Sequence, residues 1–224
     1  MADGLHLPAV EKVGSLAFHA LGRIGYAEGL ALQETLVAER RAGAVGDSVL
    51  LLEHEPVYTI GRTPDRSSLG AAAALPHPTF EISRGGQATY HGPGQLVGYL
   101  VIDLTPRGKD LHFYLRALEQ ALIDTCAAFG VSAGRREGMT GVWIGPRKLA
   151  SIGVGVRHWV SMHGFALNVT PESLAGFASI IPCGLSGVEM TCLARETARP
   201  VTVAEVAAAL RGPLAREIDA LGAA

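Results

Sequence analysis

The amino-acid sequence predicts a single α+β domain over residues 1–224, built on a mixed, largely antiparallel sheet with flanking helices. Between Thr140 and Val169, short apolar runs alternate with the breaks GPR and RHW, which is typical of three antiparallel strands joined by tight turns. Segments that predict amphipathic helices precede and follow this region in the sequence, as is typical of α+β domains. The 224 residues, 48% of them hydrophobic, are enough for one core.

The N-terminal half predicts one helix and several strands. Residues 1–14 are expected to form a tail or an edge segment. The stretch from Tyr26 to Ala42 predicts a helix that ends at Gly43. Its apolar face is expected to hold Leu30, Gln33, Val37 and Ala38. Apolar runs predict strands at Val49–Leu52, Phe80–Arg84 and Tyr99–Leu104. The segment Arg62–Pro78 is rich in Pro, Gly, Ser and Ala and predicts a long surface loop.

Two further helices are predicted in the C-terminal half. Apolar residues at spacings of three and four predict a helix that closes at Gly130, with the face Leu111, Leu115, Leu118, Leu122, Cys126 and Phe129. The run Thr202–Glu205 matches a capping box and predicts the start of the last helix. Gly212-Pro213 is expected to kink or interrupt that helix.

Composition excludes several classes of protein. A formal net charge of −2 gives no basic excess for nucleic-acid binding. Three cysteines do not make a disulfide framework. The N-terminus shows no secretory signal, and no apolar run reaches the roughly 20 residues that span a bilayer. We therefore expect a cytoplasmic protein with no nucleic-acid or membrane partner.

Two common binding motifs are also excluded. The run GPGQLVG (residues 92–98) has the spacing G-x-G-x-x-x-G and precedes a strand, whereas a dinucleotide fingerprint follows a strand and opens a helix. The histidines and cysteines show no HExxH or CxxC spacing, so no metal site is expected.

The three cysteines differ in their surroundings. Cys126 lies on the apolar face of a predicted helix, where a buried, inert thiol is the better interpretation. Cys192, in EMTCLAR, is interpreted as a strand cysteine. Cys183, in IIPCGLSG, lies in a loop-forming context that can expose a thiol beside backbone amides. A chemical role and simple burial are both open for Cys183.

A reactive thiol needs a neighbouring base or cation. His91 and His163 lie among glycines and are candidate site members, whereas His54, His112 and His158 are interpreted as structural or exposed. Among the three lysines of the chain, Lys148 lies inside an apolar strand, KLASIGVGV. It can lower the pKa of a cysteine and shuttle its proton. The alternative is a lysine at a strand start whose ammonium reaches water.

The run RGGQATYHGPGQ (residues 84–95) closely resembles the signature of the lipoyl (octanoyl) transferases, the protein N-octanoyltransferases of lipoate biosynthesis. The resemblance includes LLEHEPVYTIGR before this run and Tyr99 after it, then Lys148–Gly153, His163–Asn168 and Ile181–Gly184. These blocks follow the family's order between residues 20 and 195. One departure is the linker between Asn168 and Cys183, which is a residue longer than the family's usual pattern.

The resemblance implies the fold of lipoate and biotin protein ligases and the first step of endogenous lipoate biosynthesis. In that reaction an octanoyl (or lipoyl) group passes from acyl-carrier protein to a lysine on lipoyl domains of 2-oxoacid dehydrogenases and on the glycine cleavage H protein. The family's Cys/Lys dyad corresponds to Cys183 and Lys148, with a cysteine thioester as the intermediate. Because the donor is already activated as a thioester, no cofactor is expected.

The resemblance also implies a set of acyl-binding residues. These are Arg84, Gly85, Gly86, Gln87, Ala88, Thr89, Tyr90, His91, Ser151, Ile152, Gly153, Gly164, Phe165 and Ala166. Arginines are expected on the surface that meets the acidic carrier protein, namely Arg62, Arg135, Arg136 and Arg147. Two alternatives stay open: an ATP-dependent lipoate or biotin protein ligase on the same fold, and a non-catalytic module that binds acyl groups or carrier proteins.

Overall fold

The computed structural model describes residues 10–63, 68, 75–180 and 187–222. Its main element is an eight-stranded sheet, composed of β1 (Val10–Val13), β2 (Leu16–Ile24), β3 (Ser48–His54), β7 (Gln95–Val101), β8 (Gly134–Arg136), β9 (Met139–Ile144), β10 (Arg147–Arg157) and β11 (Val160–Asn168). A second sheet holds β4 (Val57–Ile60), β5 (Thr79–Glu81) and β6 (Ala88–His91). The helices are α1 (Tyr26–Arg41), α2 (Leu111–Ala128), α3 (Leu193–Glu196) and α4 (Val203–Asp219), with short 3-10 helices at Thr105–Arg107 and Pro171–Ser179.

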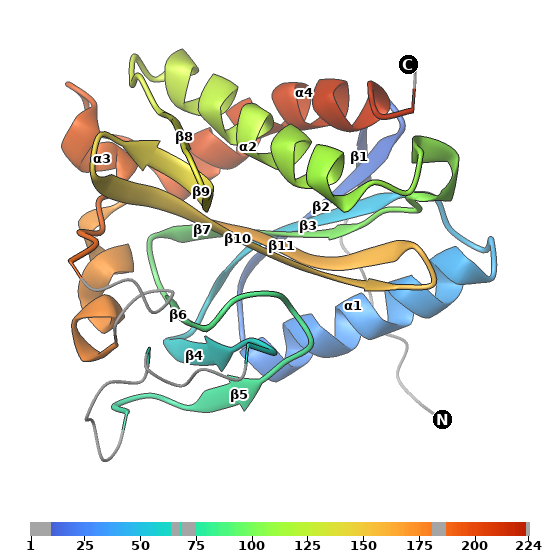
Figure 1. Ribbon diagram of the computed structural model, residues 1–224, viewed down its shortest axis with the longest axis horizontal. Coiled ribbons are helices and arrows are strands. Elements are labelled where there is room, and N and C mark those ends of the chain that lie inside the picture. Colours follow the sequence, from blue (N-terminus) through green and yellow to red (C-terminus); the bar gives the residue numbers. More distant parts are fainter. Residues whose placement is uncertain (1–9, 64–67, 69–74, 181–186, 223–224) are drawn as a thin grey trace.

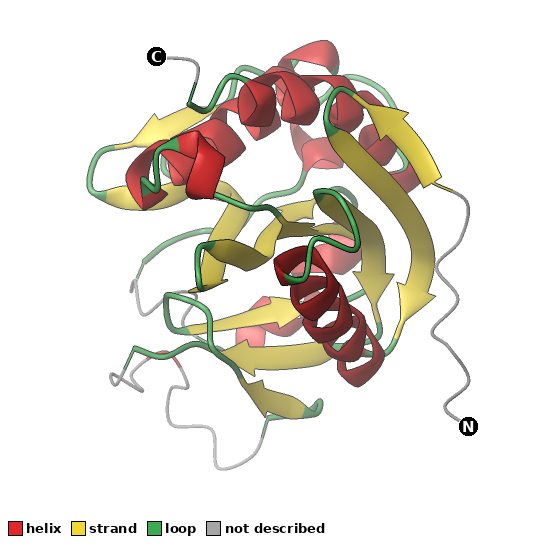
Figure 2. Ribbon diagram, turned by 90° about the vertical axis from the view of Figure 1, so that its right-hand side faces the viewer, coloured by secondary structure: helices red, strands yellow, loops and turns green. Residues whose placement is uncertain are grey.

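Helices cover both faces of the large sheet. Figure 1 shows α2 and α4 above the sheet, with α1 and the smaller sheet below it, and Figure 2 shows the same layers from the side. The strand order is β1-β2-β3-β7-β11-β10-β9-β8. Only β2 and β3 pair in parallel within it, because α1 carries the chain across between them. The predicted mixed, largely antiparallel sheet with flanking helices is therefore confirmed.

The central strands are buried on both faces. Val49 and Leu51 of β3 pack in the cluster under α2 and α4, whereas Leu50 and Leu52 pack in the cluster under α1. Side chains alternate between the faces of a strand, so a strand covered on both sides must be apolar at every position. This explains why the sequence shows a continuous apolar run here and no alternation.

Several elements lie where the sequence predicts them. The three strands between Thr140 and Val169 are β9, β10 and β11, and the helices after Tyr26 and Leu111 are α1 and α2. The capping box is present, since the Thr202 hydroxyl accepts from the Glu205 N–H and the Glu205 carboxylate accepts from the Thr202 N–H. The predicted edge segment contains β1, which ends the large sheet.

Other predictions need correction. The strand predicted at Tyr99–Leu104 runs from Gln95 to Val101, because Gly94, at φ +79°, ends a turn directly before it. The strand predicted at Phe80–Arg84 is β5, Thr79–Glu81. Strands β2, β4, β6 and β8 were not predicted, and most of the predicted loop Arg62–Pro78 lies outside the described residues.

The predicted helix faces and the predicted helix break are also partly wrong. Helix α4 runs through Pro213 without interruption. The buried face of α1 includes Leu32 and Leu36, whereas Ala38 points to solvent. Leu111 is 37% exposed because the first turn of α2 lies at the surface. Within the described residues, no helix is long and apolar enough to cross a membrane.

Candidate active site

A cavity lies where the smaller sheet meets β10, β11 and the start of α1. Its wall contains all of the expected acyl-binding residues except Ala88 and Tyr90. Four further residues complete the wall, namely Tyr26, Ile82, Tyr99 and His163. Segments separated by up to 140 positions of sequence are thus brought together around one space.

The alternation of side chains along β6 explains why Ala88 and Tyr90 lie outside the cavity wall. Neighbouring residues of a strand point to opposite sides, so Thr89 and His91 line the cavity and Ala88 and Tyr90 do not. Tyr90 packs instead against Tyr58 and Phe177, with ring centroids 5.5 and 5.7 Å away. Its place is in a small apolar core behind the cavity wall.

Glycines let the backbone segments of the site pack closely. A Cβ at Gly153 would lie 3.0 Å from Arg84 Cδ and 3.2 Å from the Gly85 carbonyl oxygen. A Cβ at Gly164 would collide with the Gly98 carbonyl oxygen of the neighbouring strand. These glycines make room for the protein's own atoms, so that β10 lies close to Arg84 and Gly85 and β11 lies close to β7.

Arg84 supplies the guanidinium of the cavity wall. The residue is 8% exposed and donates from Nη2 to the Thr59 carbonyl and hydroxyl oxygens at 2.8 and 2.9 Å, and from Nη1 to the Gly85 carbonyl at 2.9 Å. These bonds fix the cation in place and connect it to β4.

A chain of buried hydrogen bonds fixes the orientation and tautomer of the His91 imidazole. Gln95 Nε2 donates to the Tyr90 carbonyl and to Asn168 Oδ1, so Gln95 Oε1 accepts from His91 Nδ1 at 2.8 Å. The Thr59 hydroxyl then donates to His91 Nε2 at 3.3 Å. Burial lowers the pKa of His91 to about 3, with the neighbouring His54 adding to the effect.

The same polar chain continues away from the cavity. Asn168 Nδ2 donates to the Thr191 carbonyl oxygen at 3.0 Å, and the Thr191 N–H donates to the Lys148 carbonyl oxygen at 2.9 Å. A continuous buried network therefore runs from the cavity wall through His91 and Gln95 to the backbone of Lys148.

His54 and two tyrosines form an uncharged cluster beside His91. His54 Nδ1 donates to the Ile24 carbonyl oxygen, so its Nε2 accepts from the Tyr99 hydroxyl at 2.6 Å. Burial lowers the pKa of His54 to about 4 and raises the pKa of Tyr26 to about 12. Burial also raises the pKa of Tyr99 well above its usual range. The predicted structural role of His54 agrees with its full burial.

His163 presents free polar atoms to the cavity. It adopts φ +61° within β11 and is 2% exposed, and neither ring nitrogen has a hydrogen-bond partner among the described residues. Burial, with Arg84 next in importance, lowers its pKa to about 4. The buried Thr89 hydroxyl likewise has no partner in the part of the chain that the structure describes. Both groups are available to a polar group of a bound ligand.

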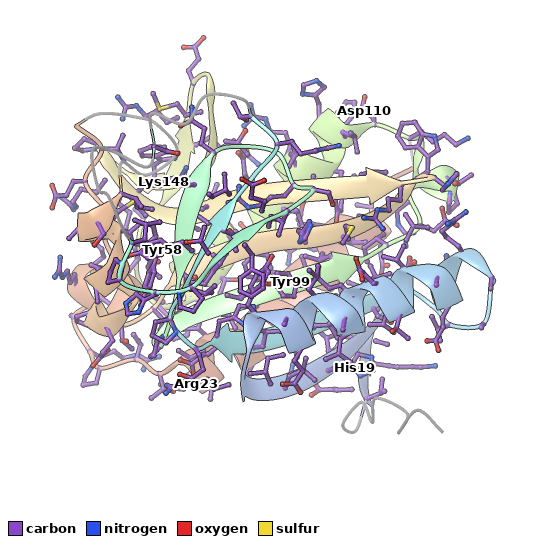
Figure 3. All side chains as sticks on the ribbon, turned by 90° about the horizontal axis from the view of Figure 1, so that it is seen from below. His19, Arg23, Tyr58, Tyr99, Asp110 and Lys148 are labelled. Carbon is purple, nitrogen blue, oxygen red and sulfur yellow. The ribbon has the colours of Figure 1, made fainter. Side chains whose placement is uncertain are left out.

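Lys148 lies outside the lining of the cavity. It is 3% exposed near the start of β10, and Figure 3 shows Tyr99 beside helix α1 and Lys148 farther along the sheet. The Lys148 N–H donates to the Glu189 carbonyl oxygen at 2.8 Å, and Lys148 pairs with Met190 in a parallel bridge. The chain that follows residue 186 is thus fixed to the backbone of Lys148.

Cys183 lies outside the described residues, so the structure gives no Lys148–Cys183 distance. The other two cysteines are buried, as the sequence predicts for Cys126, and Cys192 is the N-cap residue of α3 instead of part of a strand. Burial raises the pKa of Cys126 to about 12 and also raises the pKa of Cys192. Neither thiol has the surroundings of a nucleophile.

Tyr26, Ile82 and Tyr99 were missed as site residues. Tyr26 opens α1, and its ring lies 5.1 Å from His54 and 4.9 Å from Phe80. No local pattern distinguishes it from an ordinary helix-start residue, since its role depends on where β3 and β5 lie in space. Ile82 directly follows β5 and could have been found from its position two residues before Arg84.

The fold is that of lipoate and biotin protein ligases. The structure matches a putative lipoate protein ligase from T. acidophilum with a TM-score of 0.69 and 17% identity, covering 92% of this chain and 85% of that one. It matches a biotin protein ligase from Aquifex aeolicus with a TM-score of 0.54 and 11% identity, covering 95% of this chain and 72% of that one. At these identities the likeness concerns the fold alone.

The sequence places the chain more narrowly. Residues 25–214 match the lipoyl protein ligase A/B catalytic domain, and the chain belongs to that family. It is 54% identical over 195 residues to an octanoyltransferase of Geobacter sulfurreducens, covering 87% of this chain and 81% of that protein. It is 52% identical over 191 residues to an octanoyltransferase of Citrifermentans bemidjiense, covering 85% and 91%.

Proposed function

We propose that this protein is an octanoyltransferase of lipoate biosynthesis that moves an octanoyl group from acyl-carrier protein to a lysine of a lipoyl-carrying protein. The relatives named octanoyltransferases, at about half of all positions identical, support the acyltransferase reaction. The observation that carries the proposal is the cavity, in which the segments of the family signature form one wall.

The chemistry of the cavity wall suits an acyl chain. A saturated eight-carbon chain offers no hydrogen-bonding group except its carbonyl, so its recognition depends on burial. At about 0.8 kcal/mol per methylene, seven methylene-sized groups contribute roughly 5 kcal/mol before ordering costs. The depressed pKa values of His91 and His163 keep both imidazoles neutral at pH 7, which avoids the cost of burying charge beside the chain.

The carbonyl end of the chain needs polar partners. The Thr89 hydroxyl and the ring nitrogens of His163 face the cavity with no hydrogen-bond partner among the described residues. In the proposed complex they bond to the thioester end of the substrate, and Arg84 adds a fixed positive charge. Binding of the substrate would thus give hydrogen-bond partners to the buried Thr89 hydroxyl and His163 ring.

The proposed reaction has two steps. In the first, the Cys183 thiolate attacks the octanoyl carbonyl, the carrier's carbon–sulfur bond breaks, and the leaving carrier thiolate takes a proton from the Lys148 ammonium, which becomes neutral. In the second, the acceptor lysine amine attacks the Cys183 thioester, so an amide forms and the Cys183 thiolate is released. Lys148 stabilises the thiolate as a cation and, once neutral, accepts the proton that the attacking amine loses. Each half-reaction is easier than direct transfer.

The geometry on both sides of Cys183 is compatible with this pairing. Ile180 packs with Tyr58 and Tyr90 behind the cavity wall, and Met190 pairs with Lys148. The described residue that precedes the Cys183 segment, Ile180, thus packs behind the cavity wall, and Met190, which follows the segment, lies beside Lys148. As acceptors we propose lipoyl domains of 2-oxoacid dehydrogenases and the glycine cleavage H protein.

Among the arginines expected to meet the carrier protein, two already have acidic partners. Arg135 pairs with Glu119, and Arg147 pairs with Glu196. Arg62 and Arg136 are exposed. We therefore propose that Arg62 and Arg136 attract an acidic carrier protein more strongly than Arg135 and Arg147 do.

The acyl-enzyme provides the direct test. After incubation with octanoyl-acyl-carrier protein, the intact mass of the protein should rise by one octanoyl group, and the adduct should move to an added lipoyl domain. Cys183→Ser should form no thioester, whereas Cys192→Ser should react normally because its thiol is buried. A native protein without an adduct, or an octanoyl thioester retained by Cys183→Ser, contradicts the proposal.

The fold favours one second candidate, an ATP-dependent ligase that activates a free acid as an adenylate, because the matched structures include lipoate and biotin protein ligases. Transfer from octanoyl-acyl-carrier protein without ATP excludes this reaction. Octanoate with ATP should give no product on the lipoyl domain. Binding of the acylated carrier without any transfer would identify the protein as a non-catalytic module.

A further inference from the structure

The ammonium of Lys148 lies against the face of a tryptophan. Lys148 on β10 pairs directly with Trp143 on β9, and its Nζ lies 5.2 Å from the centroid of the Trp143 ring. Trp143 is 2% exposed and Lys148 is 3% exposed, so water screens this contact very little. Trp is the strongest aromatic partner for a cation, and the attraction grows when both groups are desolvated.

A second cation lies over the same ring. The Arg136 guanidinium carbon is 5.2 Å from the Trp143 centroid. Arg136 comes from β8 and Lys148 from β10, the two strands that pair with β9. The indole therefore has a cation from each of its two neighbouring strands within 5.2 Å of its ring centroid, and it attracts both.

The backbone of β9 also limits the position of Lys148. A Cβ at Gly141 would lie 3.0 Å from Lys148 Cε and 3.6 Å from its Nζ, so the lysine stem passes directly over this glycine. The Gly141 N–H donates to Glu119 Oε1 at 3.0 Å. Glu119 is 1% exposed, and its Oε2 accepts from Arg116 and Arg135 at 2.6 and 3.0 Å.

We propose that Trp143 is a positioning residue for Lys148, acting through the cation–π contact, with Gly141 as the backbone surface that limits the lysine stem. The proposal depends on the proposed function, in which Lys148 stabilises the thiolate and moves a proton. A lysine has four rotatable side-chain bonds, and proton transfer needs a donor–acceptor distance of about 2.6–3.2 Å. An indole face that attracts the ammonium keeps it in one position without removing a hydrogen-bond donor.

Fluorinated tryptophans test the contact without changing the size of the side chain. Fluorine withdraws electrons from the ring face and weakens its attraction for a cation. In a Trp159→Phe background, Trp143 is the only tryptophan of the chain. Replacing it with mono-, di- and trifluorotryptophan should lower kcat for octanoyl transfer from acyl-carrier protein to a lipoyl domain in steps, to about one tenth, with KM for both substrates unchanged.

Conventional variants give the matched comparison. Trp143→Phe keeps a ring and should retain more than half of kcat, whereas Trp143→Leu should lose about tenfold. Trp159→Leu is the control, because Trp159 also carries a lysine over its ring, Lys109 at 5.9 Å, but lies at the far end of β10 and β11. It should leave kcat within twofold of the native value.

A double-mutant cycle separates this proposal from the proposed function. If Trp143 acts through Lys148, fluorination should have no effect on the residual rate of Lys148→Ala. An equal stepwise loss in that background, or a kcat that does not respond to fluorination in the native background, overturns the role of Trp143. Full turnover by Lys148→Ala would instead overturn the role that the proposed function gives to Lys148.

Discussion

Buried neutral histidines are the most unusual single residues of this protein. His54, His91 and His163 lie within one cluster, each with a pKa lowered below its ordinary value of 6.5. In the folded protein they stay uncharged at pH values where the unfolded chain binds protons. The free energy of unfolding therefore falls in mild acid.

The pH dependence of stability should report this burial. For His54 the folded pKa is about 4 and the ordinary value is 6.5, so the unfolded state binds one more proton between these limits. Each such histidine should lower the free energy of unfolding by about 1.4 kcal/mol per pH unit as the pH falls through this window. Urea unfolding at pH 7, 6 and 5 should show a steep loss, and His54→Asn should reduce the slope by about that amount.

His158→Asn is the matched control, since His158 is exposed and adopts φ +51°, which asparagine tolerates. It should leave the slope unchanged. A native slope that His54→Asn does not alter would mean that His54 is solvated in the folded protein.

Lys148 provides a second test at the level of one residue. Lys148→Arg keeps a positive charge but replaces the lysine amine, which can give and take a proton, by a guanidinium, which stays protonated. It should still form the octanoyl adduct on Cys183 while transfer to the lipoyl domain falls about a hundredfold, as expected for loss of a general base. The two steps can be followed separately by intact mass, and undiminished transfer would remove the proposed base.

At the scale of elements, the site depends on how closely β7, β10 and β11 approach one another. Gly164 pairs with Tyr99 across β7 and β11, where a Cβ on it would meet the Gly98 carbonyl oxygen, and a Cβ on Gly153 would meet Arg84. Each close approach is possible only because a side chain is missing. The glycines of the signature are therefore part of the sheet's packing as well as part of the cavity wall.

Gly164→Ala should be strongly destabilising. The added Cβ would collide with the Gly98 carbonyl oxygen and contact Leu100, which are backbone and core atoms with little room to move. We expect a loss of about 3 kcal/mol in the free energy of unfolding, measured with urea, together with loss of octanoyl transfer. Gly134→Ala is the control, because a Cβ there meets nothing within 4 Å, and it should stay within about 0.5 kcal/mol.

At the scale of the whole molecule, the buried polar chain connects the cavity wall to the backbone of Lys148. Asn168 bonds both to Gln95 near the cavity and to the Thr191 carbonyl oxygen beside Lys148. Among the described residues, Asn168 is the only side chain that hydrogen-bonds both to Gln95 and to the Thr191 carbonyl oxygen.

Asn168→Leu should therefore affect stability and transfer together. It keeps the number of side-chain heavy atoms and their branching but leaves the Gln95 amide and the Thr191 carbonyl oxygen with fewer partners, at a cost of about 2–3 kcal/mol. We expect a lower urea midpoint and a lower kcat at 25 °C under conditions where the variant is fully folded. A variant with native kcat would show that this connection serves stability alone.

The sequence predicted much of the molecule, because strong local signals coincide with real elements. The Thr202–Glu205 capping box, the leucine spacing of α2 and the turns after Ile144 and Arg157 are all local. The missed strands β4 and β6 are four residues each and gain their stability from pairing with each other. Tyr26 and Tyr99 join the site through tertiary contacts between distant segments, for which no local pattern exists.

The position of β11 has a consequence for the order of folding. This strand lies between β7 and β10, so it alone joins the half of the sheet built from residues 10–101 to the half built from residues 134–168. The cavity uses both halves, from Tyr26 to Ala166. Pairing over such sequence separations is slow compared with hairpin formation. On a ribosome the cavity therefore cannot form until about three quarters of the chain, through Asn168 of 224 residues, has emerged.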